Sequence, residues 1–420
     1  MNQSIKLNKS INWSKGAAHT IGSVMGAGIL VLPAATAQLA GPLSLFSWVL
    51  MGIFSLPMVI TIGKMSSWYP DAGGMASYTT RAFGPRLGRM TGILILSAMP
   101  FGMPITALIG ANYFGCIFSL SPLFVHILAG FLLVFAVLLN VIGIRFSGKI
   151  QIFVITLILL ILFSIVIFSV PSVNLANFQF NIAGKWREAG YAMNLLFFAY
   201  MGWEMIGHMS EEFKNPHRDI PLSLGISFAF INLIYISLVF VVIGTNAYQT
   251  SNPAVAIIQL ATHSMGSKSG VVTAFLGFVL CFCAVLSYVA GFSRLVYSQA
   301  REGNLPSLFA SLHPKFHTPA NALFLFLPIF LLILTLNYLY SWDFTSLIHI
   351  PSTTFLLVYI LSMLAAAKVL PSIFGKVCAT MSAALSILVF FFAGVWVLYP
   401  ILVAIVMIFM KEAKTKIRLK

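Results

Sequence analysis

A single carboxylate lies deep inside an apolar stretch of the sequence. Glu204 ends the segment FFAYMGWE at 197–204, whereas the other acidic residues stand at the ends of apolar stretches, between them, or near the C-terminus. Removing an ionised carboxylate from water is costly unless the group is paired or protonated. Glu204 is therefore predicted to have a function. It could couple the movement of protons, or it could accept hydrogen bonds from backbone N–H groups of an interrupted helix, and the sequence leaves both roles open.

A histidine follows this carboxylate at helical spacing. His208 lies four residues after Glu204, so the two side chains would share one helical face. This spacing would allow them to share a proton. The alternative is that His208 is a hydrogen-bonded packing residue.

A glycine cluster near the N-terminus could expose backbone groups. Gly22, Gly26 and Gly28 fall within the segment GSVMGAG, and each glycine weakens a helix by about 1 kcal/mol relative to alanine. A helix that restarts after Gly28 would point free N–H groups at an anion, with its dipole adding to the attraction. The carboxylate of an amino acid fits such a site. The alternative is a small-residue surface on which another helix packs closely.

Signatures of enzymes and metal sites are missing from the sequence. It contains no Ser-His-Asp series, no HExxH and no GK[ST] after Gly73-Gly74. Cys281 and Cys283 are separated by one residue, which is not a zinc-binding spacing, and all four cysteines lie in apolar stretches. We therefore expect no enzymatic activity, no metal and no cofactor.

Composition identifies the elements that must position these residues. Of the 420 residues, 60% are hydrophobic and only 8% are charged, and the mean hydropathy is +0.98. A soluble domain carries about 25% charged residues. The sequence therefore predicts an all-α polytopic membrane protein. Twelve spans are expected at 16–40, 43–63, 90–114, 124–143, 150–170, 190–210, 221–244, 270–298, 319–338, 344–366, 377–392 and 396–410.

The basic residues indicate how these spans are oriented. With the N-terminus inside, all but three of the 24 Lys and Arg residues fall on the inner side, and the exceptions are Lys185, Arg187 and Lys268. Cytoplasmic loops are enriched in Lys and Arg. Both termini are therefore predicted to be cytoplasmic, and the net charge of +15 reflects the lipid bilayer as partner rather than nucleic acid.

Long loops recur at an interval of five spans. One follows the second span at 64–89 and another follows the seventh at 245–269, and glycine interrupts both the first and the sixth span. Because five is odd, the second copy would be inverted in the membrane, as in many secondary transporters. We therefore expect a five-plus-five inverted repeat with two extra helices. The predicted parts are a cytoplasmic segment at 1–15, repeats at 16–170 and 190–366, a hairpin at 377–410 and a cytoplasmic tail at 411–420.

Five short motifs recur in order along the sequence: MGAGI at 25–29, YPxAGG at 69–74, FAYMGWE at 198–204, KNPxRDIP at 214–221 and REGNLP at 301–306. Together they resemble the amino acid–polyamine–organocation transporter superfamily over about residues 12–410. The segments at 82–92, 100–104 and 294–300, and Glu204 with His208, carry a narrower likeness. By these, the sequence is similar to bacterial inner-membrane exporters of L-methionine and branched-chain amino acids.

The resemblance implies roles for individual residues. The backbone at Ala27 and Gly28 would bind the carboxylate of the substrate, and Phe198 would be an aromatic gate. Carbonyl groups of Val24, Phe198 and Met201 would bind its ammonium group, while Glu204 and His208 would serve coupling or gating. The full set expected to bind substrate is Val24, Gly26, Ala27, Gly28, Met103, Ile105, Phe198, Met201, Gly202 and Ser352.

The resemblance and the charge pattern together predict a transporter that works by alternating access, most similar to an exporter of L-methionine, leucine, isoleucine and valine. No span interior carries a cation for an anionic substrate, and only Glu204 could balance a cationic one. The alternatives are a proton-coupled importer, an exchanger of amino acids or polyamines, and a receptor that binds amino acids without moving them. Protons are a candidate coupling ion, and a monomer and a homodimer are both open.

Overall fold

The computed structural model describes residues 9–143, 148–179, 186–250, 253–342 and 344–407. Helices make up nearly all of this part, and it contains no β-strand, only one isolated bridge between Ile11 and Phe213. Its α-helices are α1 Trp13–Met25, α2 Gly28–Ala40, α3 Leu43–Trp68, α4 Met75–Phe83, α5 Pro85–Phe118, α6 Pro122–Ile142, α7 Gly148–Ser169, α8 Trp186–Ala199, α9 Met205–His208, α10 Pro216–Gly244, α11 Ala256–Met265, α12 Ser267–Arg301, α13 Ala320–Tyr340, α14 Phe344–Val369 and α15 Ile373–Phe391.

Ten segments of the described chain are long and apolar enough to cross a membrane, with α1 and α2 counted as one. The predicted span at 190–210 is instead divided between α8 and the short α9, and the predicted span at 396–410 corresponds to the shorter helix Gly394–Met407. The all-α membrane fold is thus confirmed, whereas twelve full-length spans are not. The predicted tail at 411–420, Lys185 and most of the segment 1–15 lie outside the described residues.

Several helices extend beyond their predicted spans. Helix α5 has 34 residues and α12 has 35, although about 20 residues cross the hydrocarbon region. The additions are polar turns that hydropathy alone does not include, such as the one carrying Arg86 and Arg89. Pro85 stands in the first turn of α5, where its missing N–H leaves no helical hydrogen bond unmade.

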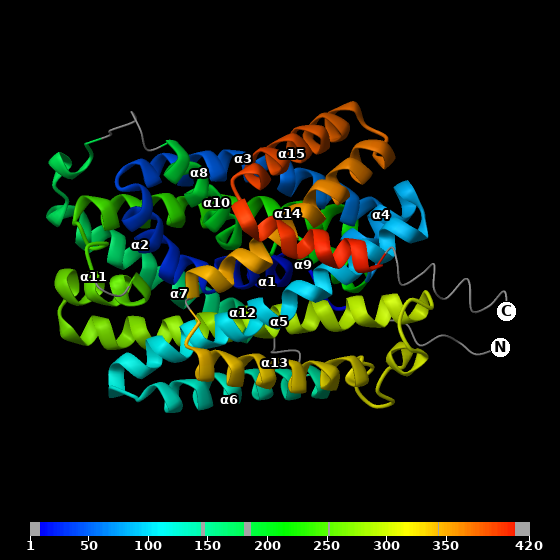
Figure 1. Ribbon diagram of the computed structural model, residues 1–420, viewed down its shortest axis with the longest axis horizontal. Helices are drawn as coiled ribbons and strands as arrows, with labels where there is room; N and C mark the ends of the chain where they lie inside the picture. The colour runs from blue at the N-terminus through cyan, green and yellow to red at the C-terminus, as the bar shows by residue number, and fades with distance from the viewer. Residues whose placement is uncertain (1–8, 144–147, 180–185, 251–252, 343, 408–420) are drawn as a thin grey trace.

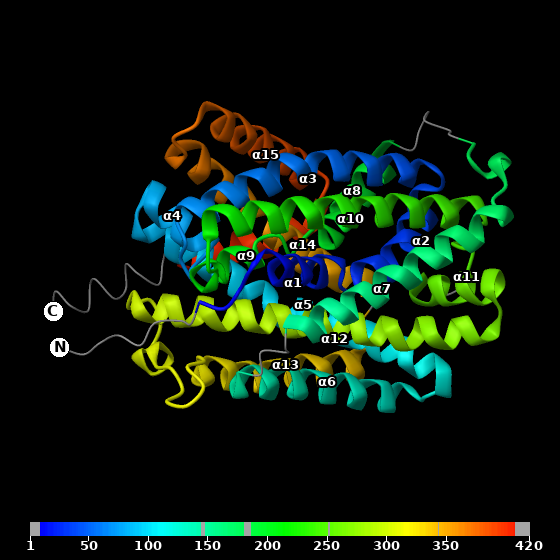
Figure 2. The same ribbon diagram turned by 180° about the vertical axis from the view of Figure 1, so that it is seen from behind.

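The helices run side by side along the long axis of the molecule (Figure 1). The broken pair α1 and α2 crosses the centre, and α6 and α13 pack together on one side in both views (Figures 1 and 2). The described chain begins and ends at the same end of this bundle, which we call the terminal end. Helix α4 lies there, whereas α11 lies at the opposite end.

The two ends carry matching joints, which we call elbows. Helix α4 is joined to α5 by Gly84, at φ +88°, and α11 is joined to α12 by Gly266, at φ +86°. In each elbow a glycine four residues after the joint packs against a threonine four residues before it: Gly88 against Thr80, and Gly270 against Thr262. An added Cβ would come within 1.7 Å and 2.1 Å of the respective threonine oxygens. The two long loops that the sequence analysis compared thus contain joints of the same local geometry.

Candidate functional site

The first helix is broken in the middle of the bundle. Helix α1 ends at Met25, and α2 begins at Gly28. Gly26 has φ +26°, a conformation that disfavours any side chain. At Gly28 an added Cβ would lie 2.8 Å from the Cα atom of Ala199, so α2 starts in close contact with the end of α8.

The sixth predicted span is broken opposite the first. Helix α8 ends at Ala199, α9 begins at Met205, and Gly202 between them has φ +116°. The fully buried Glu204 organises this break, because its Oε2 atom accepts hydrogen bonds from the Gly202 N–H, at 2.8 Å, and from the Tyr359 hydroxyl, at 2.6 Å. Its Oε1 atom is buried and has no hydrogen-bond partner in the described chain.

A tyrosine of α10 holds the two breaks together. The hydroxyl of Tyr235 lies 3.1 Å from the carbonyl oxygen of Val24 and 2.8 Å from that of Ala199. Because a hydroxyl has one proton, it donates to one of these carbonyls at a time. The Ser23 hydroxyl adds a longer contact of 3.4 Å to the carbonyl of Gly202. Hydrogen bonds from Tyr235 and Ser23 thus connect the two breaks, which lie far apart in the sequence.

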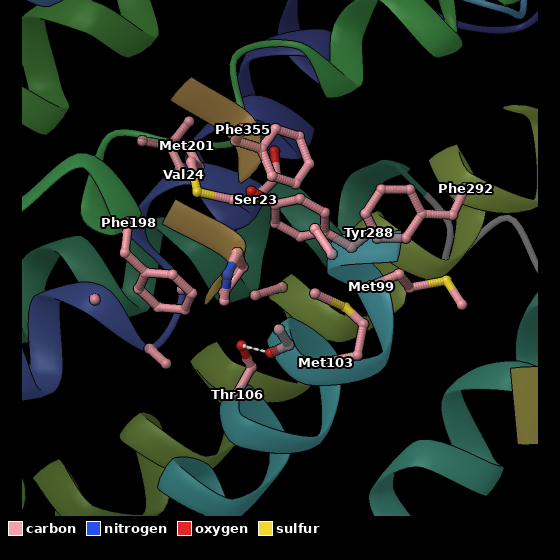
Figure 3. Close-up of a pocket in the computed structure, with 17 residues that line it drawn as sticks. Ser23, Val24, Met99, Met103, Thr106, Phe198, Met201, Tyr288, Phe292 and Phe355 are labelled. Carbon is pink, nitrogen blue, oxygen red and sulfur yellow. Dashed lines mark hydrogen bonds between the residues drawn. The ribbon is translucent and has the colours of Figure 1, made fainter. Parts of the chain in front are cut away.

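A cavity lies between the two breaks (Figure 3). The broken helices meet it from one side, and α5, α12 and α14 close the others. Figure 3 shows Phe198 near one wall and Tyr288 and Phe355 near another. The lining residues are Ser23, Val24, Gly26, Ala27, Gly28, Ala98, Met99, Gly102, Met103, Thr106, Phe198, Met201, Ala284, Tyr288, Phe292, Pro351 and Phe355.

This cavity is small in the observed conformation. Its volume is about 30 Å³, and a cavity needs about 10–15 Å³ to hold one water molecule. An organic ligand needs several times that space. The side chains around the cavity must therefore move outward before it can hold an amino acid.

The lining is mostly apolar, with hydroxyls of Ser23, Thr106 and Tyr288, and contains no Asp, Glu, His, Lys or Arg. Met99, Met103 and Met201 contribute thioethers, which are flexible and adapt to differently shaped apolar ligands. The Thr106 hydroxyl is already bonded to the Gly102 carbonyl at 2.8 Å. The first N–H groups of a helix have no acceptor within it, so the start of α2 is a candidate for the predicted carboxylate site, although the Leu30 N–H is already bonded to the Ala27 carbonyl at 3.2 Å.

Most residues predicted to bind substrate line this cavity. They are Val24, Gly26, Ala27, Gly28, Met103, Phe198 and Met201. The Val24 carbonyl is nevertheless already engaged by Tyr235, so it can bind an ammonium group only if that hydrogen bond is shared or released.

Three of the predicted residues do not line the cavity. Gly202 is a packing residue of the break, where an added Cβ would lie 2.8 Å from the Val24 nitrogen. Ile105 and Ser352 are both buried but face away. Each is next to a residue that does line the cavity, Thr106 and Pro351 respectively. One residue turns an α-helix by about 100°, so an error of one position selects the wrong face.

The resemblance implied that the eighth span, now α12, would contribute to the pocket, but sequence reasoning named none of its residues. Ala284, Tyr288 and Phe292 recur every four residues and present one face to the cavity. On α5, Met99 and Thr106 likewise lie one turn from Met103. The helical period could have supplied them once one member was known. Tyr235 had no signal, because a tyrosine in an apolar span is common.

Of the two alternatives for His208, the contacts favour the hydrogen-bonded packing residue over a proton shared with Glu204. Glu204 bonds to Gly202 and Tyr359, whereas the Nδ1 atom of His208 lies 3.1 Å from the carbonyl of Ala72. One face of a helix is a poor guide here, because the backbone at Glu204 has only just re-entered the helix. His208 instead joins α9 to the loop before α4.

Ion pairs close the terminal end beneath this site. Arg294 of α12 pairs with Glu212, and Arg301 lies 3.6 Å from Glu211. Glu211 also accepts a hydrogen bond from the Ala72 N–H at 3.0 Å. The carbonyl of Glu212 accepts hydrogen bonds from the N–H groups of residues 10 and 11. The start of the chain, α12 and the loop before α4 therefore all meet on the segment that follows α9.

Comparison with known proteins gives a consistent family. A family model described as amino acid permease matches residues 11–415. The uncharacterized amino acid permease YecA of Bacillus subtilis (strain 168) is 37% identical over 365 residues, which cover 87% of this chain and 86% of its own. The L-methionine/branched-chain amino acid exporter YjeH of Escherichia coli (strain K12) is 28% identical over 410 residues, 94% of this chain and 97% of its own.

More distant proteins share the fold. The human cystine/glutamate transporter is 27% identical over 83% of this chain and 71% of its own. Among solved structures, a manganese transporter of Eremococcus coleocola superposes with a TM-score of 0.60 over 97% of this chain and 95% of its own, at 11% identity. That likeness concerns the fold alone.

Proposed function

The chain belongs to the amino acid permease family, and we propose that it exports neutral, apolar L-amino acids, with L-methionine, leucine, isoleucine and valine as substrates. Membership makes it an amino acid transporter rather than an enzyme. The finer proposal draws its direction and substrates from the likeness to YjeH. We further propose that the terminal end faces the cytoplasm of a bacterial inner membrane, because the basic loops gather on that side.

The lining of the central cavity is the observation that supports neutral, apolar amino acids as the substrate class. It contains methionine, phenylalanine and alanine side chains and no charged group. A cationic or anionic side chain placed there would lose its water without gaining a counter-charge. The backbone at the two breaks would bind the charged amino and carboxyl groups that all amino acids share. Phe198, which is only partly buried, would close over the ligand.

A second candidate, a proton-coupled carrier of the same fold, is favoured by one feature. The buried Glu204 has an oxygen without a partner and no cation beside it in the described chain. A protonated carboxyl would suit this environment better than a carboxylate. Loss of that proton during the cycle would then link transport to a pH gradient.

Transport in proteoliposomes tests these proposals. Purified protein is reconstituted, and the vesicles are loaded with labelled methionine, leucine, arginine, glutamate or putrescine. We expect release of methionine and leucine but not of arginine, glutamate or putrescine. Release of arginine or putrescine in preference to leucine would refute the apolar cavity as the substrate site.

Imposed gradients separate the alternatives. Release that needs an amino acid outside would identify an exchanger, and net flux that reverses with the pH gradient would identify a proton-coupled carrier. Saturable binding without any flux would identify a receptor. Empty liposomes and protein with a closed cavity, such as Ala98→Phe, are the controls, since Ala98 lines the cavity.

A further inference from the structure

A second cavity opens at the terminal end, away from the central site. It lies between the end of α3, α4 and the end of α12, and its volume is about 280 Å³. Tyr69, Tyr78, Arg81, Asp71 and Glu302 are among its lining residues. This space is much larger than the central cavity and is large enough for a small organic ligand.

Charges of both signs face this cavity without ion-pair partners. The described chain contains two ion pairs, Arg294–Glu212 and Arg301–Glu211. Arg81, Asp71 and Glu302 belong to neither of them. The Asp71 Oδ1 atom accepts hydrogen bonds from the Gly73 N–H and the Ser77 hydroxyl, and Glu302 accepts one from the Asn304 amide. Both carboxylates thus keep acceptor capacity for a ligand.

The two carboxylates are close enough to influence each other. Burial, and next to it the negative charge of Asp71, raise the pKa of Glu302, while Arg301 and Asn304 act in the opposite direction. A positively charged group placed between the two carboxylates would relieve this repulsion.

The arginine of the cavity is held in a defined orientation. The guanidinium carbon of Arg81 lies 4.3 Å from the centre of the Tyr69 ring. Stacking of this kind fixes the plane of a guanidinium group while leaving its N–H edge free for a carboxylate. The same positive charge disfavours a ligand that carries only amines.

We propose that this cavity is a second binding site for a zwitterionic α-amino acid, whose ammonium group binds between Asp71 and Glu302 and whose carboxylate binds Arg81. The site is separate from the central cavity and shares no lining residue with it. This proposal depends on the proposed function only because methionine is chosen as the probe.

The second site is connected to the broken helix. The Tyr78 hydroxyl bonds to Ser66 at 2.7 Å and would lie 3.1 Å from a Cβ added at Gly207 of α9. The Asp71 N–H donates to the Ser210 hydroxyl at 2.9 Å. A ligand that joins Asp71 and Arg81 to Glu302 would therefore hold the segment after α9 in its present position.

Equilibrium binding tests the proposal on the full-length protein in detergent. The amount of labelled L-methionine bound per chain is measured for wild type, Arg81→Gln, Glu302→Gln and the control Arg86→Gln. Arg86 is exposed on α5 and does not line the cavity. We expect Arg81→Gln and Glu302→Gln each to weaken one class of site at least about tenfold, as loss of a charge-assisted hydrogen bond does, and Arg86→Gln to match wild type.

The binding experiment distinguishes failure of the second site from failure of the proposed transport function. Loss of one bound equivalent in Arg81→Gln supports the second site whether or not the central site binds methionine or the protein moves it. Acidification should weaken the second site more in wild type than in Glu302→Gln, because both proteins lose the charge of Asp71 but only wild type also loses that of Glu302. Unchanged binding in both variants would overturn the proposal. So would binding of putrescine or Mg²⁺ at this site in the absence of methionine binding.

Discussion

At the residue scale, the two oxygens of Glu204 have different environments. Oε2 receives two hydrogen bonds that hold the second break, and Oε1 receives none. The structural role that the sequence offered is therefore visible in the contacts. The proton-coupling role is compatible with these contacts, because Oε1 has no partner in the described chain and could carry a proton. A glutamine could accept the same hydrogen bonds, but it could not carry that proton.

Substitution of Glu204 should separate these roles. Glu204→Ala leaves the Gly202 N–H and the Tyr359 hydroxyl without an acceptor, at a cost of about 1–3 kcal/mol for each group, and we expect at least a tenfold loss of transport. Glu204→Gln keeps an acceptor and should transport, but without a response to pH. The measurement is efflux from proteoliposomes between pH 6 and pH 8. A glutamine variant with the wild-type pH response would exclude Glu204 as the proton carrier.

Tyr235 should matter for transport more than its single hydroxyl suggests. Tyr235→Phe removes the contact between the carbonyls of Val24 and Ala199, and we expect a destabilisation of about 1 kcal/mol with a marked fall in transport rate. The matched control is Tyr399→Phe, which removes one hydroxyl bonded to the Ser97 carbonyl at 2.8 Å. Thermal unfolding in detergent and efflux are compared. Equal transport in the two variants would show that the hydrogen bonds of the Tyr235 hydroxyl are dispensable for transport.

Individual side chains show where sequence reasoning reached its limit. The breaks could be predicted, because glycines concentrate there and an acid in an apolar segment is conspicuous. The walls could not, because α5 and α12 are apolar on nearly every face and give no polar contrast. The predictions of Ile105 and Ser352 missed the lining by one position, because the rotation of each helix in the bundle decides which residue faces the cavity.

At the scale of elements, the breaks need glycine for two different reasons. Gly202 has φ +116° and is also in contact with Val24, so a side chain there is strained and has no space. Gly225 of α10 offers a contrast, since an added Cβ would meet nothing within 4 Å. The same substitution should thus have opposite effects at the two positions.

We expect Gly202→Ala to lower the melting temperature and abolish transport, because the second break must shift away from α1. Gly225→Ala should leave transport unchanged and stabilise α10 by about 0.5–1 kcal/mol. Melting in detergent and efflux are measured for both proteins. A fully active Gly202→Ala protein would contradict the view that the two breaks depend on this close approach.

At the scale of the whole molecule, the terminal end is closed by few interactions. The pair Arg294–Glu212 is largely buried, with side-chain exposures of 14% and 11%, and it bears on the same segment as the start of the chain. The pair Arg301–Glu211 is longer and more exposed, and such pairs contribute little. The first pair should therefore dominate closure of this end.

Arg294→Gln should loosen the terminal end selectively. Loss of a charged hydrogen-bond partner costs about 1.5–3 kcal/mol, so peptides containing Ile11 and Phe213 should exchange their amide hydrogens at least about tenfold faster. Peptides from α11 at the opposite end should be unaffected. Hydrogen exchange followed by mass spectrometry checks this, with Arg301→Gln as the milder comparison. Uniform acceleration along the chain would indicate general destabilisation instead.

The paired elbows at Gly84 and Gly266 bear on the thermodynamics of the cycle. They share one local geometry at opposite ends of the bundle. If a conformation open at one end and a conformation open at the other bend at these two joints, their free energies differ through the residues in which the joints and their surroundings differ. Microscopic reversibility requires that net flux stop when the gradients across the membrane are at equilibrium. The direction of net transport then depends on those gradients, and the side chains that differ between the two ends set the rates of the individual steps.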